Sequence, residues 1–266
     1  MSGYVDEVVI PYDRDLGPVL FEHYGADTAR RVAEQTPQEV LEIAAGTGIV
    51  TRHLRNVLPK DAHLTAIDIS DSMMDVARQK FQPNEQVSFQ NADATALPFD
   101  DETFDAVVCQ FGIMFFDRDK GFREVYRTLK PGGRYLFRVW DSARYNPFAS
   151  LSFEVLKRYF PADPPQFLFD PVSCHHIDPI KEELIQVGFD PIVISVQRHV
   201  YDILDVTAFA RALVYSPVIF EIRDRGDVDP EEIVNQLAHA FKKEFGSGPT
   251  RYPMQAILFE TEKPKA

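Results

Sequence analysis

Two glycines in a short turn are the residues best placed to bind a ligand. The run from Val40 to Thr51 passes from apolar residues through Gly46 and Gly48 into a helical pattern, so it predicts a strand, a tight turn and a helix. Small residues let a ligand approach the backbone, and the first N–H groups of the helix point into the same space with a partial positive charge. The run therefore predicts a site for a nucleotide-like ligand.

The spacing around this turn limits the kind of nucleotide. Thr51 stands where the dinucleotide-binding pattern has a third glycine, and no Gly-Lys-Ser/Thr follows, which disfavours NAD and nucleoside triphosphates. A second expected strand, residues 62–68, ends in Asp68, at the offset from Gly46 where a βαβ unit places an acid near ribose hydroxyls. The sequence therefore implies a ligand with a ribose and without a diphosphate.

Two later strand ends extend the predicted site. Asp93 and Ala94 follow the third expected strand, and an acid next to a small residue suits recognition of an adenine edge. The alternative is that Asp93 is an ordinary loop or helix-cap residue. Residues 104–110 form an apolar run typical of a buried parallel strand. Ligands bind beyond the carboxyl ends of such strands, so Gln110 and Phe111 are expected beside the ligand.

Several of these segments resemble motifs of the class I S-adenosylmethionine (SAM)-dependent methyltransferases. Residues 42–48 resemble the first motif, with Ala44 where the family usually has glycine, and residues 68–73 resemble the second. Further similar segments are residues 97–99 and 129–134. The resemblance is strong over residues 38–141 and looser elsewhere, as in the small-molecule methyltransferases that include quinone-biosynthesis enzymes.

The resemblance implies an α/β fold with a doubly wound, mostly parallel, seven-stranded Rossmann-like sheet. Its last strand is expected to run antiparallel, and Gly132 and Gly133 are expected to form a structural turn before a strand over 134–140. We expect a single methyltransferase domain over residues 1–266, with a helical cap and a lid inserted. Its expected parts are an N-terminal cap (1–37), a SAM-binding core (38–141), a lid (142–177) and a C-terminal sheet edge with a helical insertion (178–266). Within the last part we expect a strand over 191–201, helices over 206–223 and 230–245, and a strand over 254–260.

The resemblance also implies SAM as the cofactor and S-adenosylhomocysteine as its product. The methionine end is expected at Glu42, Ala44 and Gly46, and the ribose on Asp68. The adenine is expected between Ile69, Met73, Asp93 and Ala94. The other expected cofactor contacts are Tyr24, Thr47, Gly48 and Gln110. For Tyr24, an ordinary place in the apolar core is the alternative.

The segment from 142 to 177 is expected to cover the methyl acceptor. It is longer than most structureless loops, it is rich in proline and aromatic residues, and it leaves the fifth strand at the carboxyl end. Four aromatic residues are expected to line the acceptor pocket: Phe111, Phe148, Phe153 and Phe167. His175 or His176 is expected to act as general base where the acceptor needs one, and the alternative is that these histidines cap a helix.

Composition limits the possible partners. The 266 residues carry a formal net charge of −13 without a basic run, which disfavours nucleic acid and anionic lipid and leaves a small-molecule acceptor. Two cysteines give neither a disulfide framework nor metal-ligand spacing, so we expect a cytoplasmic protein without a metal. No apolar run is long enough for stable insertion into a membrane. A homodimer stays open.

Three functions remain to be compared. The leading hypothesis is methyl transfer from SAM to a small apolar or aromatic acceptor, at oxygen, nitrogen or carbon. The second is a non-catalytic SAM- or nucleoside-binding module that uses the lid for a partner or dimer contact. The third, an NAD-dependent oxidoreductase, is disfavoured by Thr51 and by the lack of a hydride-transfer constellation.

Overall fold

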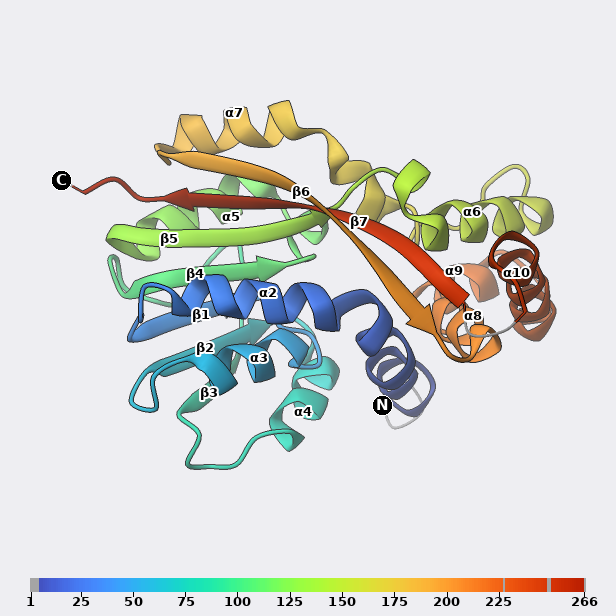
Figure 1. Ribbon diagram of the computed structural model, residues 1–266, viewed down its shortest axis with the longest axis horizontal. Coiled ribbons are helices and arrows are strands. Elements are labelled where there is room, and N and C mark those ends of the chain that lie inside the picture. The colour runs from blue at the N-terminus through green and yellow to red at the C-terminus, as the bar shows by residue number, and fades with distance from the viewer. Residues whose placement is uncertain (1–4, 227, 248–249, 266) are drawn as a thin grey trace. The chain divides into compact units, whose positions relative to one another are not determined.

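The computed structural model describes residues 5–226, 228–247 and 250–265, and these form a seven-stranded sheet with helices between the strands (Figure 1). The strand order is β3-β2-β1-β4-β5-β7-β6. The neighbours from β3 to β5 pair in parallel, whereas β7 runs antiparallel to β5 and β6. The expected fold class is therefore confirmed. The first four residues of the expected N-terminal cap lie outside the described residues.

The elements have the following bounds. The strands are β1 (Glu39–Ile43), β2 (His63–Asp68), β3 (Val87–Asn91), β4 (Phe104–Gln110), β5 (Leu129–Trp140), β6 (Ile192–Ile203) and β7 (Thr250–Glu262). The α-helices are α2 (Glu22–Ala33), α3 (Ile49–Val57), α4 (Asp71–Gln79), α5 (Arg118–Thr128), α6 (Pro147–Tyr159), α7 (Ile177–Val187), α8 (Val206–Val214), α9 (Val218–Asp224) and α10 (Pro230–Phe245). Two π-helical segments, η1 (Val5–Val9) and η2 (Tyr12–Phe21), and three short 3₁₀ segments, η3 (Ile113–Phe115), η4 (Ala143–Tyr145) and η5 (Asp170–His175), complete the set.

The chain forms two compact units. The sheet unit comprises Phe21–Val139, His176–Val196 and Ile257–Ala266, and the helical unit comprises Met1–Leu20, Trp140–His175 and Gln197–Ala256. The expected division into cap, core, lid and sheet edge stays a prediction.

The centre of the sheet unit is apolar because its strands are covered on both faces. The buried cluster includes Val40, Leu54, Leu64, Val108 and Leu136, which come from four strands and from α3. Parallel strands buried on both faces have such continuous apolar sequences. Helix α2 contacts α3 and lies in front of β1 and β4 in Figure 1.

Strand register brings two turns of the sheet unit together. Ile43 of β1 lies opposite Ile67 of β2, so the two strands end at the same level. The turn that starts at Ala44 is therefore next to Asp68. The register explains how residues far apart in the sequence share one edge of the sheet.

The structure corrects four local expectations. Residues 142–177 contain α6 and η5, so the lid segment is largely helical. The expected helix over 206–223 is two helices, because Pro217 has no N–H to continue the first one. The strand expected over 134–140 begins at Leu129, so the expected turn lies within β5; Gly132 has the positive φ that the turn needs, +80°, and the register with β4 is irregular there. The last strand, β7, is also longer than the expected 254–260.

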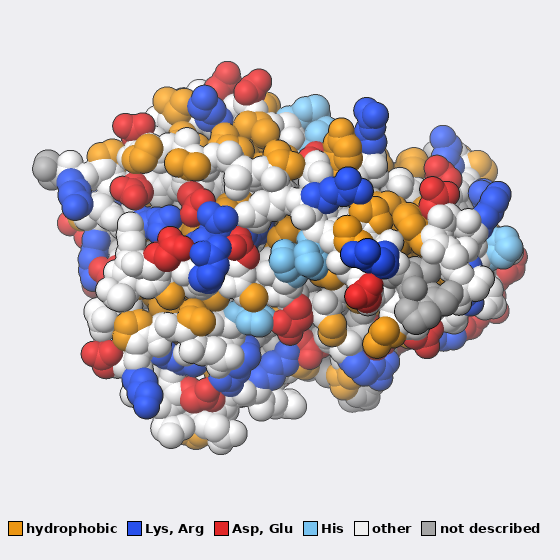
Figure 2. Space-filling model, in the orientation of Figure 1, with side chains coloured by type: hydrophobic (Ala, Val, Ile, Leu, Met, Phe, Trp, Pro, Cys, Tyr) orange, Lys and Arg blue, Asp and Glu red, His pale blue; other side chains and the backbone are white. Residues whose placement is uncertain are grey.

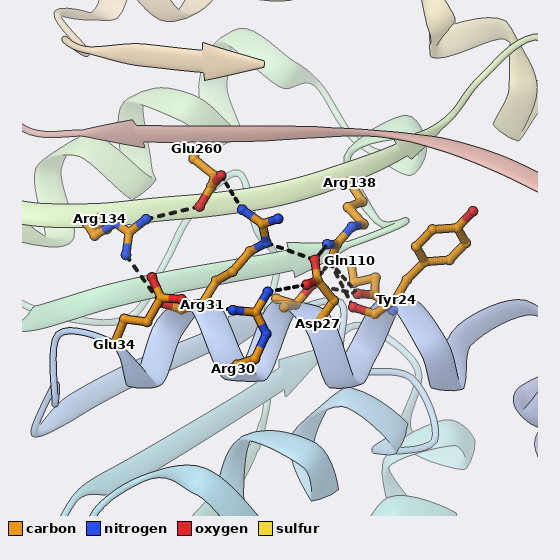
Figure 3. Close-up of polar contacts among 10 residues, drawn as sticks. Tyr24, Asp27, Arg30, Arg31, Glu34, Gln110, Arg134, Arg138 and Glu260 are labelled. Atoms are coloured by element: carbon orange, nitrogen blue, oxygen red, sulfur yellow. Dashed lines mark hydrogen bonds and ion pairs between the residues drawn. The ribbon is translucent and has the colours of Figure 1, made fainter. Parts of the chain in front are cut away.

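A buried arginine joins α2 to the sheet (Figure 3). Arg138 of β5 has no exposed side-chain surface, and its guanidinium donates to the backbone oxygen of Tyr24 at 2.8 Å and to the side chains of Thr28 and Asp27. Gln110 of β4 accepts from the hydroxyl of Thr28 at 2.9 Å. The network therefore fixes α2 across the ends of β4 and β5.

Asp27 carries the charge that balances Arg138. Its carboxylate also accepts from Arg30 at 2.7 Å and from Arg31 at 2.8 Å. Burial opposes its ionisation, but the hydrogen bonds from Arg31 and Arg30 and the charge of Arg138 lower the pKa of Asp27 to about 2. Burial lowers the pKa of Arg138 to about 10. Both groups are therefore charged at neutral pH.

Two further features are the lengths of the described helices and the distribution of charged side chains on the surface. No helix in the described parts of the chain is both long and apolar enough to cross a membrane. On the face shown, Lys and Arg side chains are interspersed with Asp and Glu side chains (Figure 2).

The first prediction concerns the Arg138 network. Asp27→Ala leaves a buried guanidinium without its carboxylate, so we expect the free energy of unfolding to fall by roughly 3–5 kcal/mol. Urea unfolding at pH 7 measures the change. The matched control is Asp75→Ala, whose partner Arg78 is at 2.7 Å on an exposed surface, and it should cost less than about 1 kcal/mol. Equal losses in the two variants would contradict the assigned role of Asp27.

Candidate SAM-binding site

The turn after β1 has backbone conformations that favour small residues. Gly46 and Gly48 have φ values of +56° and +80°. A Cβ added to Gly46 would meet no atom within 4 Å, whereas one on Gly48 would lie 3.0 Å from the Cβ of Ala77 in α4. Gly48 is therefore needed for packing against α4, and Gly46 borders open space that a ligand can enter.

Ala44 shares the unusual conformation of these glycines. Its φ is +55°, which costs a residue with a Cβ on the order of 1–2 kcal/mol. A Cβ on Gly112, after β4, would lie 2.6 Å from the Cβ of Ala44 and 2.7 Å from the sulfur of Cys109. The methyl group of Ala44 therefore fits because Gly112 leaves room for it.

Asp68 closes the turn through backbone hydrogen bonds. Its Oδ2 accepts from the N–H of Gly46 at 2.8 Å, and its Oδ1 accepts from the N–H of Ser70 at 2.8 Å. Burial raises the pKa of Asp68, and these hydrogen bonds oppose that shift. Each carboxylate oxygen can accept a second hydrogen bond. A further backbone hydrogen bond comes from Ile69. The expected role of Asp68 at the ribose stays a prediction.

Three buried polar atoms beside the turn have no hydrogen-bond partner among the described residues. They are Oε2 of Glu42, which is 2% exposed, and the hydroxyl oxygens of Thr47 and Thr51. Burial raises the pKa of Glu42 to about 8; the neighbouring Thr51 opposes the shift and the charge of Asp68 adds to it. Buried polar atoms in native proteins are nearly always paired, so an unpaired group of this size indicates a place for polar ligand atoms. A cationic amino group fits the free oxygen of Glu42.

The residues expected around the adenine differ in their surroundings. Ile69, directly after Asp68, is 73% exposed, so its side chain is open to a flat apolar ligand. The side-chain amide of Asn91 donates to the backbone oxygen of Ile69 at 2.8 Å and steadies that turn. Met73 is half-buried on α4 and Ala94 is buried. These positions are compatible with an adenine site, which stays a prediction.

Asp93 is engaged locally. Its Oδ1 accepts from both the N–H and the hydroxyl of Thr95 at 2.8 Å, and these hydrogen bonds lower the pKa of Asp93. This is the loop-capping arrangement that was the alternative from the sequence. Recognition of the adenine by Asp93 stays a prediction.

Gln110 and the aromatic residues near it form a packed group at the end of β4. The amide of Gln110 accepts from Thr28 and donates to the backbone oxygen of Phe21 at 3.2 Å, so it joins β4 to the N-terminal helices. The ring of Phe111 lies 5.7 Å from Tyr24 and 5.9 Å from Phe21, between ring centroids. Tyr24 is fully buried. The contacts of Tyr24 and Gln110 are those of core residues, and their expected roles at the cofactor stay predictions.

The other residues expected at the acceptor belong mainly to the helical unit. Phe148 packs against Trp140 at 5.1 Å, and Phe153 packs against Phe169 at 4.7 Å, between ring centroids. The N–H of Phe167 donates to Glu221 at 2.9 Å. The acceptor pocket that these residues and Phe111 were expected to form stays a prediction.

The two candidate bases fall in different units. Nδ1 of His175 lies 2.8 Å from the backbone oxygen of Val172, so this nitrogen carries the proton. His176 directly precedes α7, in the sheet unit. Their role as general base stays a prediction. Within the described ranges, no group of three or more His, Cys, Asp or Glu side chains could hold a metal ion.

Sequence reasoning missed two residues of this site. Thr51 was noted only as a missing glycine, although its hydroxyl is buried beside Glu42. A threonine between the buried Val50 and Leu54 on one helix was the available signal. Asn91 gave no such signal, because its role depends on a contact with a segment distant in sequence. Gly112 was expected beside the ligand from its place after the fourth strand, but its contact with Ala44 could not be predicted.

Comparison with known proteins identifies the family. Residues 40–133 match the methyltransferase domain family. Over 138 residues the chain is 39% identical to a demethylmenaquinone methyltransferase of Clavibacter sepedonicus, an alignment covering 50% of this chain and 55% of the relative. Over 169 residues it is 32% identical to the ubiquinone/menaquinone biosynthesis C-methyltransferase UbiE of Escherichia coli, covering 58% and 67%. The chain belongs to the class I SAM-dependent methyltransferase family.

The cofactor of this family is SAM, as the sequence predicted. The chain spans little more than half the length of the Clavibacter relative and about two thirds of UbiE. The YcgJ protein of Bacillus subtilis is 20% identical, with a TM-score of 0.59 over 92% of this chain and 100% of that chain. A phosphoethanolamine N-methyltransferase of Haemonchus contortus, in complex with S-adenosylhomocysteine, is 20% identical with a TM-score of 0.60, over 97% and 57%. These two structures share the fold.

The second prediction separates the two roles of glycine at this site. In Gly46→Ala the added methyl group enters open space, so we expect a stability loss of about 1–2 kcal/mol from the left-handed backbone. Binding of S-adenosylhomocysteine should weaken more than tenfold, because the methyl group occupies ligand space. In Gly112→Ala the methyl group meets Ala44 and Cys109, so the main effect should be on unfolding. Calorimetric binding and urea unfolding of both variants make the comparison, and unchanged affinity in Gly46→Ala would contradict it.

The third prediction concerns the pH dependence of stability. The folded-state pKa of Glu42 is about 8, above its unfolded value of 4.5, so the contribution of this group to stability is present below pH 4.5 and is lost as pH rises toward 8. In ligand-free protein, Glu42→Gln should therefore be stabilised relative to the wild type at pH 8 more than at pH 5. Urea unfolding at the two pH values measures this difference. A difference that does not change with pH would show that Glu42 ionises normally.

Proposed function

We propose that this protein transfers the methyl group of SAM to a small apolar or aromatic acceptor, and that a ring carbon of a quinol is the acceptor to test first. The observation that supports this most directly is the group of ligand-binding features at the ends of β1 and β2. Open space at Gly46, the carboxylate of Asp68 and the unpaired oxygen of Glu42 occur there together. A nucleoside joined to a cationic amino acid has matching groups for all three.

Each part of SAM has a matching residue in this chain. Asp68 would accept from the ribose hydroxyls, and Glu42 would accept from the amino group of the methionine part. The exposed Ile69 would contact the adenine. When bound, SAM supplies a methyl group that its sulfonium charge has already activated.

Because the donor is activated, the task of the protein is mainly to position the acceptor. Correct placement of two reactants contributes on the order of 7–11 kcal/mol, and a base is needed only for an acceptor that is protonated at neutral pH. A quinol is such an acceptor, because loss of its hydroxyl proton makes the ring carbon nucleophilic. Phe111, directly after β4, has the residue type suited to contact with an aromatic ring, and it is 7% exposed.

The choice of a quinol is supported by the relatives. The two reported above are named for methylation of demethylmenaquinone and for ubiquinone and menaquinone biosynthesis, and UbiE is named a C-methyltransferase. The alignments leave part of each relative unmatched.

The fourth prediction tests methyl transfer. The protein is incubated with SAM and, separately, a demethylated menaquinol analogue, a catechol and an aliphatic amine. Release of S-adenosylhomocysteine and addition of one methyl group to the quinol ring carbon are expected, and mass spectrometry with NMR locates the methyl group. Asp68→Asn should bind SAM less tightly by roughly 1.5–3 kcal/mol, since it loses charged hydrogen bonds to the ribose.

Two outcomes would overturn parts of this proposal. Methylation of the catechol or the amine alone would replace the quinol by another acceptor class. Tight binding of SAM without turnover on any acceptor would favour a binding module over an enzyme. Unfolding curves for Asp68→Asn serve as the control, because this residue also holds the turn.

A further inference from the structure

We propose that Glu42 is a neutral acid in the free protein and releases its proton when the amino group of the cofactor binds beside it. The inference rests on the proposed function, because it takes SAM or S-adenosylhomocysteine as the ligand of this turn. It adds a specificity role for Glu42: the site gains a charge pair only with a ligand that carries a cation at this end.

The position of Glu42 disfavours a charge. The residue lies in the central strand β1, where its register partners are Ala66 of β2 and Val108 of β4. Its side chain is almost completely buried and its Oε2 has no partner among the described residues. An isolated carboxylate in such surroundings costs far more free energy than a neutral carboxyl group.

The titratable groups that face Glu42 do not offset this cost. Asp68 of β2 and Cys109 of β4 are the titratable groups that interact with it, and their ionised forms are negative. Burial, with the charge of Asp68 in addition, raises the pKa of Glu42 to about 8. At neutral pH the free protein therefore holds this carboxyl group mostly in its neutral form.

The basic residues of the nearest helix, α3, have other partners. Arg52 binds the carboxylate of Glu85, and His53 contacts Glu22. Arg55 donates to the backbone oxygens of Ala62 at 2.6 Å and Leu58 at 3.2 Å. A cation for Glu42 would therefore be supplied by the ligand.

An ammonium group next to Oε2 would make the ionised form of Glu42 more stable than the neutral form. The charge pair stabilises the carboxylate, so the pKa of Glu42 falls on binding and a proton leaves for solvent. Linkage then makes affinity depend on pH. As pH rises toward about 8, binding should tighten by up to tenfold for each pH unit, until the amino group of the ligand begins to lose its proton. At pH 7 close to one proton should be released for each ligand bound.

The experiment measures protons directly. S-adenosylhomocysteine is titrated into the full-length protein at pH 7 by calorimetry in three buffers that differ in ionisation enthalpy, and the dependence of the observed enthalpy on the buffer gives the number of protons released. The matched ligand is 5′-methylthioadenosine, which keeps the adenine and ribose but has no amino acid. It should bind without releasing a proton. Any proton that it does release would come from groups that face the adenine and ribose, such as Asp68.

Two variants complete the test. Glu42→Gln should bind S-adenosylhomocysteine more weakly and release no proton. Asp68→Asn should also bind more weakly but keep the release. If Glu42→Gln does not fold, the comparison of the two ligands on the wild type decides alone.

The possible failures are distinct. Binding of S-adenosylhomocysteine to the wild type without proton release would overturn the role of Glu42 and leave the proposed function standing. Equal release with 5′-methylthioadenosine, or release that persists in Glu42→Gln, would assign the proton to another group and also overturn it. No binding of S-adenosylhomocysteine would instead refute the proposed function on which this inference rests.

Discussion

The carboxylate of Asp68 connects two turns that are distant in sequence, and the candidate site depends on this connection. One oxygen holds the N–H of Gly46, after β1, and the other holds the N–H of Ser70, after β2. Parallel pairing of β1 and β2 brings these turns to one level, but it does not orient them. The carboxylate orients them, so the residue expected to bind a ribose also shapes the surface on which the ribose would rest.

Asp68 and Glu42 show how surroundings give different properties to two acids at one site. Asp68 receives three backbone hydrogen bonds, from Ser70, Gly46 and Ile69, that oppose the effect of burial, whereas Oε2 of Glu42 has no partner among the described residues. The free protein therefore carries an unfavourable group in its central strand. Natural proteins keep such groups where binding requires them, at a cost in stability that other regions must offset.

Much of the sheet unit could be predicted because its signals are local. Ser70 begins α4 with a side-chain hydrogen bond to the N–H of Met73, and Gly188 ends α7 with a φ of +111°. The apolar run in β4 and the glycines after β1 are local signals of the same kind. The hydrogen bond that Gln110 accepts from Thr28 could not be predicted, because the two residues are 82 positions apart in the sequence. The glycine turn at Gly132 could be predicted, but the hydrogen bond that its N–H donates to the backbone oxygen of Lys263 could not, because that residue is distant in sequence.

The two halves of the proposed reaction differ in how much the sequence could say about them. Binding of a nucleoside depends on backbone conformations and on acids at strand ends, and these need particular residue types at fixed spacing. An apolar acceptor needs only a surface of suitable shape, which many aromatic residues can form. Phe148 and Phe153 have the residue type expected of such a surface, yet each packs against another ring of the helical unit. Residue type alone does not separate an aromatic residue that fills a core from one that contacts a substrate, because both are selected for apolar area. The sequence can therefore predict residues for the cofactor half of the site, while the acceptor half depends on the packing of helices whose side chains the sequence does not place.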